Sequence, residues 1–278
     1  MIFKKNIRLN KSDFFFFLNN IKDYLSFGDS KVSIWYFTKI KNVGDLVGPY
    51  IISSITKKPI RKNILGVGKH YLSAGSILEQ ATKSSIVWGS GVISSTQNVP
   101  DFLQNVSLVR GYLTKNRILN GELDNKIAVG DPALALPRFY VPSASKKFKI
   151  GIIPHYVDFD DVTNSNQDDN IRVIDVRQDV EDFIDDLVSC EYIFSSSLHG
   201  LIIADTYGVP NKWIKLSDKL DGDDFKFYDY YSVYPKREVS PLNLGGDNSH
   251  DFNDYLKLCS YQQDDILIDN ILRSFNYD

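Results

Sequence analysis

The segment EYIFSSSLHGLIIADTYGVPNKWIKL, residues 191–216, contains the two hydrophobic patterns from which an α/β fold is built. The apolar run at 191–197 predicts a strand that ends in a polar turn. The apolar stretch after Gly200 predicts a helix that stops at Gly208. A further short run at 211–216 predicts the next strand. Together these elements indicate one strand–helix–strand unit of a parallel sheet.

The same alternation of strands and helices extends over most of the chain. Runs rich in β-branched and aromatic residues alternate with helical patterns, which favours parallel sheets covered by helices on both faces. The expected strands are 32–37, 85–90, 106–111, 126–130, 148–155, 171–176, 191–197 and 211–216. Helices are expected at 44–56, 112–120 and 180–189. The predicted fold class is therefore α/β.

The predicted elements divide into two lobes. Prolines, small polar residues and lysines at 136–149 separate the first series of strands from the second. We therefore expect an N-terminal α/β lobe at 1–140 and a C-terminal α/β lobe at 141–249. The helical patterns within 250–278 are expected to pack back on the first lobe. The acidic segment 158–170 has no apolar period and predicts a solvated loop.

The composition argues against several classes of protein. The chain of 278 residues has 32 Lys and Arg against 35 Asp and Glu, a formal charge of −3, which argues against a nucleic-acid partner. Cys190 and Cys259 lie far apart, without the Cys/His clusters of a metal site, so no metal is expected. Free thiols in a reducing compartment, the cytoplasm, are the simplest interpretation.

The N-terminal segment is basic and contains a short aromatic run, Phe14 to Phe17. This run is much shorter than the roughly 20 apolar residues that a membrane-spanning helix needs. Two interpretations stay open. The segment is either a first helix that packs on the core or a peripheral contact with an anionic membrane surface.

Polar residues follow several of the expected strands, where the loops of an open α/β sheet form the ligand crevice. Asp45 lies at or near the start of a helix and is either its cap or a catalytic group. Arg110, at the tip of an apolar strand, is placed to bind a carboxylate or phosphate. His155, with Asp158 nearby, is an acid/base candidate. Asp131 precedes a proline, which favours a turn or helix cap.

Two turns are candidates for binding an anion. Gly89, Ser90 and Gly91 form a Gly-Ser-Gly turn that lets the backbone approach a ligand, although no acidic ribose ligand follows at the spacing of a dinucleotide site. The second turn, at 195–197, leads into the helix that begins at His199. The first N–H groups of that helix suit a phosphate or carboxylate, and Gly200 is expected to leave room for it.

Taken in order, these motifs resemble the polysaccharide pyruvyl transferase family. The resemblance covers about residues 32–216 and is carried by NVGDLVGPYI, VWGSGVI, VRGYLT, VGDPALALP, IGIIPHYVD, VIDV and FIDDLVSCEYIFSSSLHGLIIADTYGVPNKW. The family's histidine in its S-x-x-H-G element corresponds to His199, and its strand-end arginine corresponds to Arg110. Many members carry an arginine where this chain has Ser197.

The resemblance implies two Rossmann-like lobes that face a central cleft, as in GT-B glycosyltransferases. It also implies transfer of pyruvate from phosphoenolpyruvate to a hydroxyl pair of a hexose in a surface polysaccharide or capsule precursor, giving a cyclic ketal without a metal or other cofactor. We expect three residues to be catalytic, His199, Asp45 and His155. The expected donor-binding residues are Arg110, Ser195, Ser196, Ser197, Gly200, Gly89, Ser90 and Gly91.

Two other functions stay open from the sequence. A nucleotide-sugar-dependent glycosyltransferase would share the GT-B-like architecture. A non-catalytic glycan-assembly protein would account for the arginine that is missing at Ser197. An acceptor carried on a lipid would place the protein at the inner face of the cytoplasmic membrane.

Overall fold

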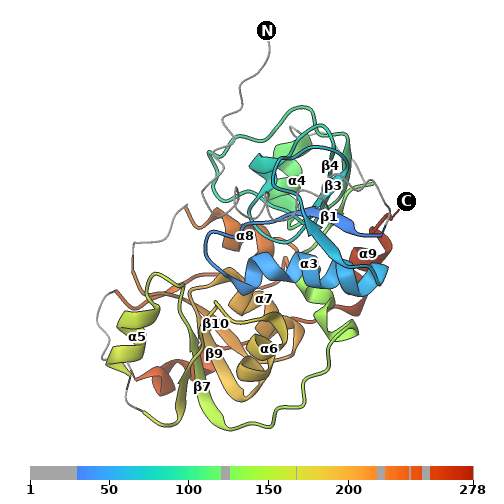
Figure 1. The fold of residues 1–278 in the computed structure, drawn as a ribbon. Coiled ribbons are helices and arrows are strands. Elements are labelled where there is room, and N and C mark those ends of the chain that lie inside the picture. The colour runs from blue at the N-terminus through green and yellow to red at the C-terminus, as the bar shows by residue number, and fades with distance from the viewer. Residues whose placement is uncertain are drawn as a thin grey trace.

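Two parallel β-sheets form the framework of the protein (Figure 1). The computed structural model describes residues 30–119, 126–166, 168–217, 223–237, 239–245 and 251–277. The six-stranded sheet has the order β2-β1-β3-β4-β5-β6, and the five-stranded sheet has the order β11-β10-β9-β7-β8. Parallel strands connected by helices give each half a Rossmann-like character, as predicted. The GT-B-like arrangement and the central cleft stay predictions.

The six-stranded sheet lies in the N-terminal half of the chain. Its strands are β1 (Val32–Trp35), β2 (Ile60–Lys62), β3 (His70–Leu72), β4 (Ser85–Trp88), β5 (Asn105–Val109) and β6 (Ala128–Val129). The helices between and after them are α3 (Val43–Thr56), η1 (Leu78–Gln80), α4 (Tyr112–Leu119) and η2 (Pro132–Arg138), where η denotes a 3₁₀ helix.

The five-stranded sheet follows in the C-terminal half. Its strands are β7 (Phe148–Ile153), β8 (Ile171–Val173), β9 (Cys190–Ser195), β10 (Asn211–Lys215) and β11 (Leu242–Asn243). The helices are α5 (Phe159–Ser165), α6 (Val180–Val188), α7 (Leu198–Thr206), α8 (Phe225–Tyr231), η3 (Phe252–Leu258) and α9 (Asp265–Arg273).

Helix α7 is buried along its whole length, which distinguishes it from the amphipathic α6. Its polar residues His199, Asp205 and Thr206 are buried as well, so no face of the helix is open to solvent, as expected of a helix enclosed between layers. Helix α7 packs against η2 and α3, which belong to the half with the six-stranded sheet. In Figure 1, α3 and α7 lie between the two sheets. One hydrophobic core therefore joins the two halves, with Val43 and Val47 of α3 in the same cluster as Leu201 and Ile202 of α7.

The C-terminal helix α9 returns to the six-stranded sheet. It packs against η2 and β6, and Ile271 is fully buried there. The indole Nε1 of Trp88 donates a hydrogen bond to Ser274 Oγ (3.1 Å), and the Phe275 ring packs edge-on against the Trp88 ring at 4.8 Å. These contacts place the end of the chain beside β4. The division of the chain near residue 140 stays a prediction.

The structure corrects the expectation of a loop at 158–170. Residues Phe159–Ser165 form α5 instead. Asp160 and Asp161 lie in its first turn, where carboxylates favour a helix, and Val162 is buried in a small core beneath the five-stranded sheet. Val162 is the one buried residue of α5, so the helix packs through a single apolar side chain and has no extended apolar period in its sequence. The short strands β2, β3 and β11 were not expected either.

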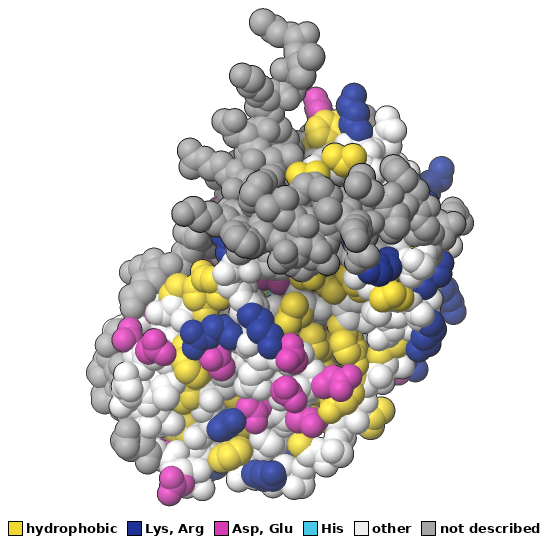
Figure 2. Space-filling model, viewed as in Figure 1, with side chains coloured by type: hydrophobic (Ala, Val, Ile, Leu, Met, Phe, Trp, Pro, Cys, Tyr) yellow, Lys and Arg dark blue, Asp and Glu magenta, His cyan; other side chains and the backbone are white. Residues whose placement is uncertain are grey.

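Cys190 and Cys259 are both free thiols, the first buried and the second partly buried. Within the described ranges no helix is long and apolar enough to cross a bilayer. The basic N-terminal segment lies outside the described residues. On the face seen in Figure 2, acidic and basic side chains are interspersed over the half that holds the five-stranded sheet, without a large patch of one sign among the residues described there.

Candidate active site

His199 lies in the first turn of α7, directly beyond the carboxyl end of β9. Its side chain is almost completely buried, with 8% of the residue exposed. The imidazole packs on the first turn of α3, because a Cβ added at Gly44 would lie 2.3 Å from His199 Nδ1. A glycine at this point of the NVGD motif thus lets a helix of one half approach the histidine of the other.

Asp131 faces His199 from the opposite half of the protein. It caps η2, with its Oδ1 accepting a hydrogen bond from the Ala133 N–H at 2.9 Å, which confirms the predicted cap. Its other oxygen, Oδ2, lies 3.7 Å from His199 Nε2. Both atoms are buried, and neither has a hydrogen-bond partner among the described residues. Sequence reasoning missed this pairing, because the local pattern of Asp131 indicates only a cap.

The environment of His199 keeps the imidazole neutral near neutral pH. Burial lowers the pKa of His199 below its ordinary value, since the charged form loses hydration. The Asp131 carboxylate opposes this shift, whereas the positive charges of Arg110 and Lys226 reinforce it. Burial is the main cause of the lowered pKa.

The first turn of α7 offers backbone donors beside His199. Ser197 is the N-cap residue, but its side chain makes no capping hydrogen bond. No described residue accepts a hydrogen bond from the N–H groups of Leu198, His199 or Gly200. Unpaired N–H groups at a helix N-terminus suit an anion.

The serines before α7 mostly hold the turn itself. Ser195 Oγ bonds to the Ile153 carbonyl at 3.1 Å and accepts from the Ser197 N–H at 3.0 Å. Ser196 Oγ accepts from the His155 N–H at 2.9 Å. A Cβ added at Gly200 would lie 2.4 Å from Ser195 Oγ. The space expected to admit a ligand beside Gly200 is therefore filled by Ser195, and the donor-binding roles of these residues stay predictions.

The Gly-Ser-Gly turn after β4 also packs against protein. Gly89 has a φ of +100°, and a Cβ there would lie 2.2 Å from Pro132 Cγ. A Cβ at Gly91 would lie 2.5 Å from Arg110 Cζ. The Ser90 hydroxyl donates to the Gly75 carbonyl at 3.2 Å. Close packing explains the two glycines, and donor binding by this turn stays a prediction.

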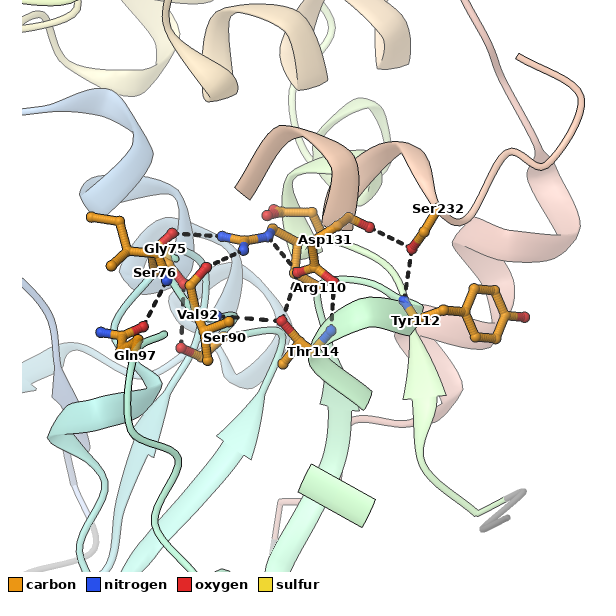
Figure 3. Close-up of polar contacts among 12 residues, drawn as sticks. Gly75, Ser76, Ser90, Val92, Gln97, Arg110, Tyr112, Thr114, Asp131 and Ser232 are labelled. Atoms are coloured by element: carbon orange, nitrogen blue, oxygen red, sulfur yellow. Dashed lines mark hydrogen bonds and ion pairs between the residues drawn. The ribbon is translucent and has the colours of Figure 1, made fainter. Parts of the chain in front are cut away.

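Arg110 is completely buried, and its guanidinium donates to protein groups (Figure 3). Nε donates to Asp229 Oδ2 at 2.9 Å, Nη1 to Ser76 Oγ at 2.6 Å and Nη2 to the Val92 carbonyl at 2.5 Å. Asp229, in α8, also accepts from the Thr114 N–H and hydroxyl, both at 2.7 Å. The charge of Arg110 is therefore balanced by Asp229 inside the protein. The predicted donor clamp stays a prediction.

The other two catalytic candidates lie at neighbouring strand ends. The helix α3 is capped by Asn42, whose side chain accepts from the Gly44 N–H at 2.9 Å, so Asp45 is in the first turn and is not the cap. His155 follows β7, and its ring packs on Tyr156 with the centroids 4.3 Å apart. Among the described residues, no group of three or more His, Cys, Asp or Glu side chains is placed to hold a metal ion.

Asp45 should make the stability of the protein depend on pH. Burial raises its pKa from 3.8 to about 7, so the native state binds this proton more tightly than the unfolded chain. The stabilisation is fully present below about pH 4 and is lost as the pH rises through about 7. Urea unfolding of the Asp45→Asn variant should show a flatter dependence over this window. The exposed Asp160→Asn should keep the wild-type slope, and an equally steep slope in both variants would exclude Asp45 as its source.

Comparisons with known proteins identify the family. The chain is 30% identical over 215 residues to an uncharacterized protein of Acanthamoeba polyphaga mimivirus, covering 73% of this chain and 75% of the viral protein. It is also similar to the crystal structure of an uncharacterized protein from Klebsiella pneumoniae, at 13% identity and a TM-score of 0.47, over 85% of this chain and 99% of that one. The family model for polysaccharide pyruvyl transferase matches residues 35–218. The match includes the site residues from Asp45 to His199, and the chain belongs to the polysaccharide pyruvyl transferase family.

Proposed function

We propose that the protein transfers the pyruvyl group of phosphoenolpyruvate to two hydroxyls of a hexose in a surface polysaccharide or its precursor, which gives a cyclic ketal. The family supports a transferase that acts on a polysaccharide. The observation that carries the proposal is the buried imidazole of His199 beside N–H groups of α7 that have no acceptor within the described part of the chain. A proton-transfer group and an anion-binding helix end are the two functions that this reaction requires.

The reaction needs two proton transfers. One sugar hydroxyl adds to C2 of the enol while C3 takes up a proton and becomes a methyl group. The C2–O bond to phosphate then breaks, and the second hydroxyl adds to the same carbon. Of the two hydroxyl protons, one balances the proton gained by C3 and the other leaves with inorganic phosphate.

His199 is the proposed general acid/base. Its lowered pKa leaves the imidazole neutral and able to accept a hydroxyl proton near neutral pH. The N–H groups of Leu198, His199 and Gly200 would bind the departing phosphate, which compensates for the arginine missing at Ser197. Asp45 and His155 are proposed to assist at the acceptor hydroxyls. No metal or organic cofactor is part of the proposed chemistry.

We further propose a two-lobed, GT-B-like enzyme. The two sheets and the helices between them support a GT-B-like pair of lobes with the substrates bound between them. We further propose a cytoplasmic enzyme of capsule or exopolysaccharide synthesis. A lipid-linked acceptor would bring it to the inner face of the membrane, where the basic N-terminal segment would make a peripheral contact.

The proposal is tested by mixing the protein with phosphoenolpyruvate and a panel of hexosides. We expect release of inorganic phosphate that depends on the acceptor, together with a product that is heavier by one pyruvate ketal in mass spectrometry. Tight binding of a UDP- or GDP-sugar, without any response to phosphoenolpyruvate, would indicate a glycosyltransferase instead. Binding of the glycan without turnover of either donor would indicate a non-catalytic assembly protein.

A further inference from the structure

We infer that Asp131 is a positioning residue for His199: its free carboxylate oxygen holds the proton on Nε2 of the imidazole and leaves Nδ1 to exchange protons with the substrate. The expected change in kcat rests on the proposed function, whereas the expected tautomer of His199 in the free protein does not. Asp131 thereby has a second role besides the helix cap that its local sequence indicates.

The carboxylate of Asp131 is fixed in direction by its capping hydrogen bond. Oδ1 accepts from the Ala133 N–H at 2.9 Å, and Pro132 follows at the start of η2. Oδ2 is thereby directed toward the interior, and Asp131 has no exposed surface. A buried carboxylate oxygen without a donor is costly, so buried polar atoms of this kind normally have a partner.

The group that faces Asp131 Oδ2 is His199 Nε2, which also lacks a hydrogen-bond partner among the described residues. This nitrogen is buried and lies 3.7 Å away. A donor proton on Nε2 satisfies both atoms after a small closure of this gap, since a normal N–H···O distance is about 2.9 Å. A proton on Nδ1 instead would set the lone pair of Nε2 against the carboxylate. The pairing therefore selects the Nε2–H tautomer.

The same contact supports the histidine when it becomes charged. Once Nδ1 has accepted a proton, the imidazolium is stabilised by the negative charge of Asp131. This matters because burial and the cations Arg110 and Lys226 all disfavour that charge. Gly44 lies under the Nδ1 edge of the ring, so the ring is held between α3 and η2.

The two partners come from different halves of the chain. Asp131 follows β6 of the six-stranded sheet, and His199 follows β9 of the five-stranded sheet. They meet because α7 packs directly on η2. The acid/base group is therefore competent only when the two halves are packed as in this structure.

The tautomer can be measured in the free protein. The chain has four histidines, and a His199→Gln variant assigns the His199 signals in ¹⁵N NMR spectra of histidine-labelled full-length protein. We expect Nε2–H for His199 in the wild type. In Asp131→Asn, the amide oxygen must stay on the Ala133 N–H, so the amide NH₂ faces Nε2 and should shift the ring to Nδ1–H. The pKa of His199 should fall further in this variant, because the negative charge of Asp131, which raises that pKa, is lost.

The kinetic arm compares Asp131→Asn with a matched cap variant. Asp264 also caps a helix, α9, through its side chain, which accepts from the Leu267 N–H at 3.0 Å, and it is exposed. Asp131→Asn should lower kcat for pyruvyl transfer on the order of 100-fold with little change in the KM for phosphoenolpyruvate, a size typical of a misplaced catalytic group. Asp264→Asn should retain wild-type kcat.

The possible results separate the two proposals. A wild-type His199 in the Nδ1–H form, or the same tautomer and pKa in Asp131→Asn, overturns the positioning role even if the enzyme is active. Wild-type kcat in a folded Asp131→Asn also overturns it. A tautomer change in a protein that never transfers pyruvate would support the positioning role and contradict the proposed function.

Discussion

Replacing His199 with alanine should lower the rate of pyruvyl transfer by about 10²–10⁴-fold, the usual contribution of a general acid/base. The imidazole is the buried titratable group at the first turn of α7 and faces Asp131. Without it, the acceptor hydroxyl must lose its proton to water. Phosphate release from phosphoenolpyruvate with a reactive hexoside measures the effect. Nearly normal transfer by His199→Ala would exclude His199 as the acid/base.

The pH profile of the wild type provides an independent check. A base must be neutral, and the pKa of His199 lies below its ordinary value of 6.5. If His199 is the base that limits the rate, kcat should fall on the acid side only below about 6.5, whereas an Asp45 base, with its pKa raised to about 7, would place the acid limb near pH 7. His199→Gln keeps most of the side-chain volume and should lose this acid limb. A limb that persists in the variant would belong to another group, with His155 and Asp45 as the next candidates.

Loss of activity must be separated from loss of packing, because His199 is buried. Ile203 lies in the same helix, is fully buried and carries no titratable group. Ile203→Val should destabilise the protein by about 0.5–1.5 kcal/mol and leave the rate of transfer essentially unchanged. If Ile203→Val reduced transfer as much as His199→Ala, the effect would be one of packing.

The strands with long apolar runs could be predicted from the sequence, and the shortest ones could not. The run in 148–155 contains β7, and the run in 191–197 covers β9 apart from its first residue. By contrast, β2 consists of three partly buried residues, Ile60–Lys62, two of which are basic. Three residues are too few to establish a period of two. Such a strand is fixed by its pairing with β1, which is not a local property.

The candidate site could likewise be predicted from the sequence only in part. The position of His199 after a strand and at a helix start could be predicted, because both boundaries are local. Its contact with Asp131 could not, since it depends on the packing of η2 against α7. The ion-pair partner of Arg110 could not be predicted either. Asp229 lies in α8, where the sequence predicts no helix or strand. Local patterns locate strand ends, whereas tertiary packing decides which of their side chains meet.

The ion pair between Arg110 and Asp229 leads to the second large effect. Arg110→Ala should lower the free energy of unfolding by about 3–5 kcal/mol, because it leaves the Asp229 carboxylate buried without its cation. The pair is fully buried, with Nε and Oδ2 2.9 Å apart. The pair of Arg172 and Asp186 has the same 2.9 Å separation but is partly open to solvent, with Arg172 exposed and Asp186 half-buried, and serves as the control. Arg172→Ala should cost at most about 1 kcal/mol, since water screens and replaces a surface pair.

A double-mutant cycle separates the ion pair from a role in binding the donor. Asp229→Leu alone should be as damaging as Arg110→Ala, because it removes the acceptor of Thr114 as well as the counter-ion. Arg110→Met combined with Asp229→Leu should cost clearly less than the sum of Arg110→Met and Asp229→Leu measured singly, since neither charge is left unpaired in the double variant. Additive losses in urea unfolding would show that the two charges do not depend on each other. Arg110→Lys tests the donor clamp: a raised KM for phosphoenolpyruvate in a variant with near-wild-type stability would favour it, and an unchanged KM would leave Arg110 with the structural role alone.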